Sequence, residues 1–344
     1  MILKDLKAMP GTHPGDLIRL RDSVYATDLL ITAIAHLDLF SRLKSNPADI
    51  RSICDDLRIK PRPADVMLTY FTALGLITVK GGLYTIADPA SEHLTDDSEW
   101  NLIPYFSTQK ERPVVGKMLE VLRSGKPAGW GGKQEETEWE AAMERDDFAD
   151  MFTAGMDSRG ACFAPGLAKS FDFSKSGSIL DIAGASGIYA ACIKERHPGI
   201  KAALLEKPPV SEIAGIGLRK RGMEDKITVI GADMFKDEIP AGYDIHLYSH
   251  VMHDWGIEEN RQLIRKSYRS LNKGGLIMIH DAHLNRDKSG PLSVAEYSVL
   301  LMFSTAGKCY SIGELESLLL SEGFTGISYQ ETVGNRSIIT ARKK

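Results

Sequence analysis

The stretch Ser178–Ile188, with the sequence SILDIAGASGI, constrains the fold of this chain more than any other feature. It begins as a short apolar strand, continues into a turn of small residues, and leads to a helix-like run that ends near Arg196. Strand, tight turn and helix form the unit that cradles a nucleotide in open α/β sheets, beyond the carboxyl end of the strand. The turn needs small residues because ligand and backbone approach closely there. The same pattern also occurs where a turn only connects a strand to a helix. Whether this turn binds a ligand must therefore be judged from later segments of the sequence.

The C-terminal half of the chain alternates between strand-like and helix-like segments. Strands are predicted over 178–183, 201–206, 226–231, 243–248, 275–281, 324–331 and 336–342. Helices are predicted over 187–197, 209–221, 257–272 and 311–322. This alternation is typical of a doubly wound, Rossmann-like α/β domain with a mostly parallel sheet, here of seven strands.

The N-terminal part is mostly helical by its pattern. Apolar residues recur at helical spacing from Asp16 to Leu43, in a stripe wide enough to face the protein's own core or another subunit. Helix starts near Asn46 and Pro61 precede a glycine-turn hairpin over 76–86, which is a winged-helix pattern. Winged helices often bind DNA, but no Lys/Arg stripe for phosphates is present, which favours a dimerisation or substrate-lid role.

A glycine-rich loop over 124–137 separates the two parts, and helices are expected over Glu138–Asp157 and Arg159–Phe171. One face of these helices carries flexible methionine and aromatic phenylalanine side chains. Its members are Met143, Phe148, Met151, Phe152, Met156 and Phe163. Helix core is the common explanation for such a face, and an apolar substrate pocket is the alternative, because methionine adapts to irregular ligands.

Composition excludes several classes of function. The formal net charge of −4 creates no global field for nucleic acid or an anionic membrane surface. The four cysteines form no CxxC pair, which argues against a disulfide framework or a zinc site. No signal peptide and no run of about 18 apolar residues is found. We therefore expect a cytoplasmic protein that binds neither nucleic acid nor membranes.

An acidic residue follows or ends each of the first three predicted strands of the α/β part: Asp181, Glu206 and Asp233. A carboxylate at the tip of the second strand grips a ribose diol, although a solvated acid is the structural alternative. Asp233 would accept a hydrogen bond from an adenine amino group, with Met234 packed on the ring. Three carboxylates near one cleft repel phosphates, so they favour the cationic cofactor S-adenosylmethionine over a dinucleotide.

His253 follows the fourth strand and would face the same cleft, within the segment His253-Asp254-Trp255. Histidine titrates near neutrality and accepts a proton at pH 7. A loop histidine is more often structural or exposed, but its place beside a cofactor cleft favours a catalytic role.

These segments resemble the small-molecule O-methyltransferases of plants (caffeate and hydroxyindole type) and of bacterial natural-product synthesis. The family's Asp-Val-Gly-Gly-Gly-x-Gly turn corresponds to 181–187, its Asp-Leu-Pro to 206–208, and its Gly-Asp-Met-Phe to 232–235. Its His-Asp-Trp stands unchanged at 253–255, and the similarity covers nearly the whole chain. The resemblance implies a homodimer with a winged-helix dimerisation domain over 1–123, bridging helices over 124–171, and a class I methyltransferase domain over 172–344.

The resemblance also implies the residues of the site. His253 would be the general base for a hydroxyl of a small, aromatic or polyketide-like molecule, and Asp281 would orient it. No metal is required, and the product is S-adenosylhomocysteine. Cofactor contacts would come from Asp181, Ala183, Gly184, Gly187, Glu206, Asp233, Met234 and Ser249. The substrate pocket would include Met156, Phe163, Asp254, Met302 and Phe303.

Some departures of the sequence from the family pattern bear on the site. Ala183 and Ala185 replace turn glycines, Asp281 replaces the first of two glutamates that flank the base in plant members, and Cys309 stands near the second. Three alternatives therefore stay open: methylation of carbon or nitrogen, an inactive binding or regulatory protein, and a nicotinamide oxidoreductase. The last lacks a GxGxxG phosphate turn.

Overall fold

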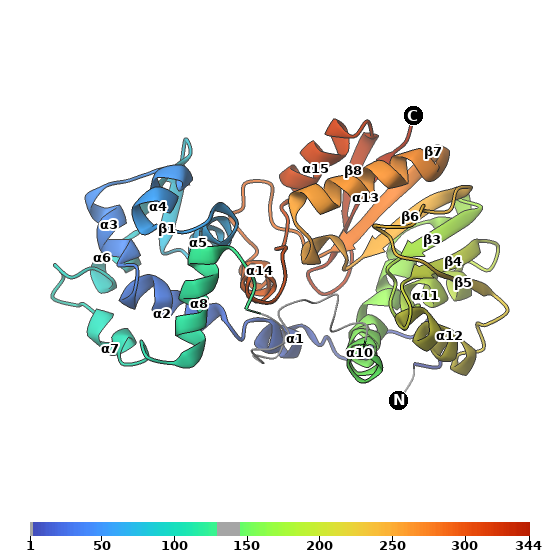
Figure 1. The fold of residues 1–344 in the computed structure, drawn as a ribbon, viewed down its shortest axis with the longest axis horizontal. Coiled ribbons are helices and arrows are strands. Elements are labelled where there is room, and N and C mark those ends of the chain that lie inside the picture. The colour runs from blue at the N-terminus through green and yellow to red at the C-terminus, as the bar shows by residue number, and fades with distance from the viewer. Residues whose placement is uncertain (1–2, 129–144) are drawn as a thin grey trace. The chain divides into compact units, whose positions relative to one another are not determined.

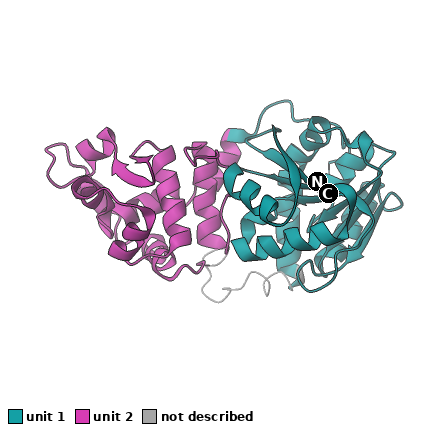
Figure 2. Ribbon diagram, turned by 90° about the horizontal axis from the view of Figure 1, so that it is seen from above, with its two compact units in different colours: residues 1–15, 138–283, 312–344 teal, residues 16–137, 284–311 magenta. Residues whose placement is uncertain are grey.

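The computed structural model describes residues 3–128 and 145–344. Contacts divide the chain into two compact units, which Figure 2 shows in different colours. The sheet unit contains residues 1–15, 138–283 and 312–344, and the helical unit contains residues 16–137 and 284–311. Residues 284–311, which the sequence analysis included in the methyltransferase part, thus pack with the N-terminal helices.

The helical unit consists of short helices and one hairpin, labelled in Figure 1. Its first helices are α1 (Gly15–Asp22), α2 (Ala26–Ala35), α3 (Leu39–Ser45), α4 (Ile50–Leu57) and α5 (Pro61–Ala73). The hairpin β1 (Ile77–Lys80) and β2 (Leu83–Ile86) is followed by α6 (Asp88–His93), α7 (Ile103–Ser107), α8 (Pro113–Ser124) and, much later, α14 (Leu292–Ser304). The predicted order of helix, helix and hairpin is therefore present.

Two local predictions for this unit are wrong. The apolar stripe of Asp16–Leu43 is divided among three helices, and Asp38, with a φ of 48°, separates the last two. The next helix does not begin at Asn46 and Pro47. Instead, Asp49 caps α4, because its side chain accepts a hydrogen bond of 2.8 Å from the Ser52 amide.

The sheet unit holds a seven-stranded sheet with helices on both faces. The strands are β3 (Ser178–Ile182), β4 (Lys201–Glu206), β5 (Ile227–Gly231), β6 (Tyr243–Ser249), β7 (Leu271–Asp281), β8 (Thr325–Glu331) and β9 (Ser337–Arg342). The helices are α10 (Asp146–Ser170), α11 (Ile188–Arg196), α12 (Val210–Lys220), α13 (Ile257–Ser270) and α15 (Ile312–Ser321). Figure 1 shows α13 and α15 on one side of the sheet and α10, α11 and α12 on the other. The predicted α/β fold is confirmed.

The strand order is β5-β4-β3-β6-β7-β9-β8, and only the pairs formed by β9 are antiparallel. The strands β3 and β6 are neighbours in the sheet, although β4 and β5 lie between them in the chain. Such a reversal of strand order is the topological switch point where open α/β sheets bind ligands, beyond the carboxyl ends of the strands.

One helix replaces the two that were expected before the sheet. α10 runs unbroken through the predicted boundary at Ser158, because no proline lies there and Gly160 packs against Ile188. Pro165 lies inside this helix without ending it. Most of the predicted loop, and Met143 with the start of the first predicted helix, lie outside the described residues.

Among residues 3–128 and 145–344, no helix combines the length and apolarity needed to cross a membrane.

Candidate active site

The turn between β3 and α11 forms the floor of the candidate site. Ala183 and Ala185 have φ values of 55° and 48°, and Gly187 has a φ of 73°. The left-handed region suits glycine and costs other residues about 1–2 kcal/mol each. At Gly184, an added Cβ would lie 2.5 Å from the Asp181 carboxyl group and from Leu204, so only glycine fits there. Ala183 and Ala185 thus adopt a left-handed backbone conformation that favours glycine.

Replacing Ala185 with glycine is expected to raise the free energy of unfolding by roughly 0.5–1 kcal/mol. Relief of the left-handed strain exceeds the entropy that glycine adds to the unfolded chain. Urea denaturation of the two proteins measures the difference. The matched control is Ala154→Gly at an exposed position of α10, which should lose about 1 kcal/mol instead. Equal destabilisation by both changes would show that the turn is not strained.

Asp181 lies beneath this turn and is fully buried. Its Oδ2 accepts a hydrogen bond of 3.3 Å from the Ala190 amide in the first turn of α11, whereas its Oδ1 has no hydrogen-bond partner among the described residues. Burial raises the pKa of Asp181 to about 7. The side chain therefore joins β3, the turn and α11, and its predicted contact with a cofactor stays a prediction.

Glu206 ends β4 and holds the turn from the neighbouring strand. Its two carboxylate oxygens accept hydrogen bonds from the amides of Ala185, at 2.9 Å, and Lys207, at 2.8 Å. A carboxylate has about four lone-pair sites, so two remain for a ligand. Burial raises the pKa of Glu206 to about 7. A bound cation would favour the ionised form, so this carboxylate suits a cationic ligand.

Asp233 follows β5, next to Glu206 at the same edge of the sheet, because Gly231 pairs with Glu206. Its Oδ1 accepts hydrogen bonds from the amides of Phe235 and Lys236, at 2.9 and 3.2 Å. Burial raises the pKa of this carboxyl group, but the two backbone hydrogen bonds and the charges of Lys236 and Lys207 together hold the pKa below its usual value. Met234 is half-buried beside it.

Asp157 of α10 makes a contact to the turn that the sequence analysis missed. It accepts a hydrogen bond of 2.6 Å from the Ser186 hydroxyl and pairs with Arg221, whose side chain is only 1% exposed, at 2.5 Å. The three residues join α10, the turn and the end of α12. No spacing in the sequence indicates such a contact, because 64 residues separate Asp157 from Arg221.

His253 and Asp281 are brought together at the ends of β6 and β7. The Nδ1 atom of His253 lies 2.6 Å from Oδ1 of Asp281, and both side chains are 4% exposed. The Ala282 amide donates to the same oxygen at 2.7 Å. Asp254 Oδ1 lies 3.7 Å from Nε2 of His253. Burial lowers the pKa of His253, but the Asp281 and Asp254 carboxylates outweigh burial and raise the pKa above its usual value.

Burial lowers the pKa of the other buried histidines around this pair. Burial lowers the pKa of His280 to about 3 and that of His283 to about 4, and it holds the pKa of His250 well below its usual range. Ser249 hydrogen-bonds His280 at 2.9 Å and is itself buried. Among these four histidines, only His253 has a pKa above its usual value.

The residues expected in the substrate pocket fall in both units. Met156, Phe163 and Asp254 belong to the sheet unit, where the Phe163 ring lies 6.3 Å from that of His250. Met302 and Phe303 belong to the helical unit and are buried in α14, with the Phe303 ring 4.1 Å from that of Tyr25. Their roles in substrate binding stay predictions.

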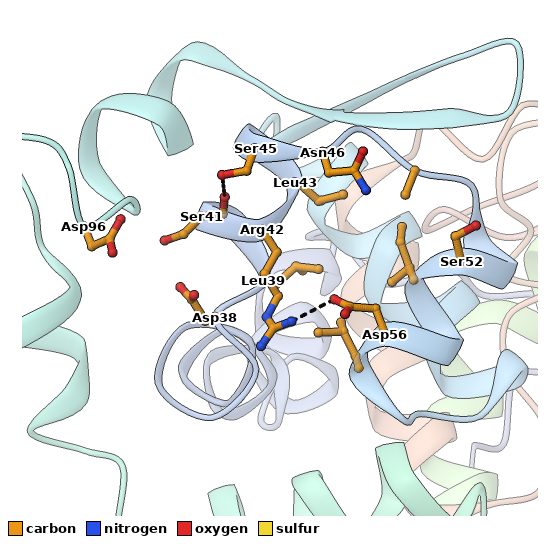
Figure 3. Close-up of a pocket in the computed structure, with 13 residues that line it drawn as sticks. Asp38, Leu39, Ser41, Arg42, Leu43, Ser45, Asn46, Ser52, Asp56 and Asp96 are labelled. Atoms are coloured by element: carbon orange, nitrogen blue, oxygen red, sulfur yellow. Dashed lines mark hydrogen bonds and ion pairs between the residues drawn. The ribbon is translucent and has the colours of Figure 1, made fainter.

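A pocket of about 430 Å³ lies in the helical unit between α3 and α4, and no residue assigned to the site lines it. Figure 3 shows the polar side chains that line it, including the ion pair of Arg42 and Asp56 at 2.9 Å. None of the predicted cofactor or catalytic residues contributes to it.

Comparisons with known proteins assign the chain to a family. The family described as the O-methyltransferase domain matches residues 120–325. The chain belongs to this O-methyltransferase family. It is accordingly an S-adenosylmethionine-dependent O-methyltransferase.

Relatives of this methyltransferase match over most of their length. The tetracenomycin polyketide synthesis 8-O-methyl transferase of Streptomyces glaucescens is 27% identical over 97% of this chain and 99% of its own. The L-tyrosine C(3)-methyltransferase of Streptomyces lavendulae is 28% identical over 87% of this chain and 84% of its own. The structure of a family 2 O-methyltransferase of Planctomyces limnophilus in complex with apigenin is 28% identical, covers both chains completely and has a TM-score of 0.90.

Proposed function

We propose that this methyltransferase methylates a hydroxyl group of a small aromatic or polyketide-like molecule, with His253 as the general base. The observation that carries the proposal is the 2.6 Å contact between His253 Nδ1 and the buried Asp281 carboxylate. Asp281 accepts a hydrogen bond from Nδ1–H, which leaves Nε2 as the basic nitrogen of the ring. A general base contributes typically about 10²–10⁴-fold to a rate.

The chemistry needs such a base because a phenol has a pKa of about 10 and is mostly protonated at neutral pH. His253 Nε2 takes the hydroxyl proton, and Asp281 stabilises the imidazolium that forms. Burial of both side chains strengthens this pairing, since water does not screen it. The proton then leaves His253 to solvent after transfer.

The strand ends fit S-adenosylmethionine, which supplies an electrophilic methyl group when bound. Glu206 retains two acceptor sites for a ribose diol. Asp233 Oδ2, which lies 3.6 Å from the Lys236 ammonium group, would accept a hydrogen bond from an adenine amino group. Met234 would pack on the adenine, and Gly184 and Gly187 would admit the cofactor close to the turn. Ser249 would contact the amino-acid end.

The acceptor class follows from the relatives and from apolar side chains of the site. One relative acts in tetracenomycin polyketide synthesis, and another binds apigenin, whose hydroxyl groups are phenolic. Met156 and Phe163 would offer an aromatic acceptor an apolar wall. A second candidate function, C-methylation of a phenol, is favoured by the similarity to an L-tyrosine C(3)-methyltransferase. The same base would serve it, because a phenolate also reacts at its ring carbons.

We also propose that the helical unit is a winged-helix dimerisation domain and that the enzyme is a homodimer. Leu17 and Leu20 of α1 are 74% and 72% exposed, and Val24 just beyond is 56% exposed. This apolar stripe is typical of a surface that another protein covers. Sedimentation equilibrium would give twice the monomer mass, and a monomer at all concentrations would contradict the proposal.

Calorimetry and a methylation assay test the function in that order. S-adenosylmethionine and S-adenosylhomocysteine should bind, and NAD should not. Phenols and hydroxylated polyketides are then offered with labelled S-adenosylmethionine, and the product is analysed for methoxy or ring-methyl groups. Binding without transfer to any acceptor would favour the regulatory alternative. Ring methylation alone would favour the C-methyltransferase.

Asp233→Ala is expected to weaken S-adenosylmethionine binding by roughly 1–3 kcal/mol, the effect of stranding a hydrogen-bond partner. Asp233→Asn is the matched variant, because its amide oxygen still accepts from the Phe235 and Lys236 amides and keeps the turn. The NH₂ group of this asparagine would face the adenine amino group, so the Asp233→Asn variant should also bind S-adenosylmethionine weakly. Its free energy of unfolding should be unchanged. A dissociation constant equal to that of the unmodified enzyme would remove Asp233 from the site.

A further inference from the structure

His250 is a buried residue that the proposed mechanism does not use. Its side chain is 2% exposed, and neither ring nitrogen has a hydrogen-bond partner among the described residues. Leaving a buried polar group unsatisfied costs about 1–3 kcal/mol. The residue also has a φ of 59°, and backbone strain of this kind is concentrated at ligand sites. A bound ligand would offset both the unsatisfied ring nitrogens and the strained backbone of His250.

The neighbours of His250 suit a metal ion. Its Nδ1 lies 3.5 Å from Asp281 Oδ1, too far for a good hydrogen bond. One nitrogen each of His250 and His253 and one oxygen of Asp281 lie within 4.8 Å of one another. Zinc bonds of about 2.0–2.1 Å place the ligands of a tetrahedron about 3.3 Å apart. The separation of His250 and Asp281 thus fits directly, and the 2.6 Å contact of His253 with Asp281 would open by less than about 1 Å.

We propose that His250, His253 and Asp281 form a binding site for Zn²⁺ that inhibits the enzyme. Two imidazoles and one carboxylate are a ligand set that zinc takes, with water in the fourth position. The ion would replace the proton on His253 Nδ1, which leaves to solvent, and no electron is transferred. Zinc would act as an inhibitor and not as a cofactor, because it engages the base itself.

The surroundings limit the affinity. Rings of Phe163, Tyr189 and His280 surround the His250 ring at 6.3, 6.1 and 5.4 Å. The positive charges of Arg159 and Arg336 act on His250, whereas Asp281 and Asp254 supply negative charge. These opposing charges favour reversible binding that is weaker than the binding of a structural zinc site.

The test uses Co²⁺ as a spectroscopic probe and Zn²⁺ in calorimetry, both with the full chain. Tetrahedral Co²⁺ absorbs strongly in the visible range, and Zn²⁺ should displace it with a stoichiometry of one. His250→Asn removes the ligand and tolerates a positive φ, as asparagine commonly does. It should lose at least about 10–100-fold in affinity for zinc. His283→Asn is the control, because His283 is also buried with an unpartnered Nε2 but lies outside the trio.

Binding of S-adenosylmethionine by each variant, together with its thermal unfolding, shows that the fold is kept. His250→Gly, which relaxes the backbone, replaces His250→Asn if that variant does not fold. Equal affinity for zinc in the unmodified protein and the His250 variant would overturn the proposal, as would an octahedral Co²⁺ spectrum. The metal readouts need no acceptor, so they stand even if the proposed methylation fails. Loss of methyl transfer on adding Zn²⁺, with recovery on adding EDTA, tests the inhibitory part, which rests on the role of His253.

Discussion

Replacing His253 with alanine is expected to lower the turnover number at least about 100-fold, the lower end of a general-base contribution. The acceptor hydroxyl would then lose its proton only to water. The affinity for S-adenosylmethionine should change less than threefold, about 0.65 kcal/mol, because His253 lies in the turn that follows β6 and is not among the residues proposed to contact the cofactor. Single-turnover kinetics and calorimetry measure the two effects separately.

Chemical rescue provides the control for this variant. His253 is 3% exposed, so its removal leaves a cavity lined by Asp281 that imidazole can enter. Added imidazole should restore part of the activity, and N-methylimidazole, which has no N–H to donate to Asp281, should restore less. A turnover number within threefold of that of the unmodified enzyme would show that another group removes the proton.

Asp281→Asn is expected to lower the turnover number roughly 100-fold as well. Asparagine keeps the size of the side chain but lacks the charge that stabilises the imidazolium, and it no longer selects the Nδ1–H tautomer. If Asp281 acts only through His253, its loss cannot exceed that of His253→Ala. The double variant should therefore be no slower than His253→Ala alone. A further tenfold loss in the double variant would give Asp281 a separate role.

The pH profile distinguishes this positioning role from a structural one. The pKa of His253 is raised, and its neutral form is the active base, so turnover should rise with pH through a pKa above 6.5. Removing the Asp281 charge lowers that pKa, so the rise should move to lower pH in Asp281→Asn. A structural defect would reduce the rate without moving the profile.

The sheet could be predicted because its strands have strong local patterns. Parallel strands covered on both faces are mostly apolar runs, such as Ile179–Ile182 with its single acid Asp181, and glycine-containing turns mark their ends. The edge at which Glu206, Asp233 and His253 emerge follows from the same pattern, because all parallel strands end there. This part of the site needs no knowledge of tertiary contacts.

Contacts between distant segments could not be predicted in the same way. The break expected near Ser158 is absent, because α10 continues through it. Helix propensity could not predict this, since it does not include the packing of Gly160 on Ile188. The Asp157–Arg221 pair joins helices whose charged residues look solvent-exposed in the sequence. The left-handed backbone at His250 has no signal at all, since histidine adopts it only where the surrounding structure holds it.

The route of the chain between the two units limits how this enzyme could be recombined. The chain passes from one unit to the other four times, near residues 15, 137, 283 and 311. The two ends of the segment 284–311 lie side by side, since Leu284 and Ser311 form a β-bridge. A gene fusion with a single junction would therefore separate α14 from the helices it packs on. A chimaera that exchanges the helical unit would have to carry residues 16–137 and 284–311 together from the same parent.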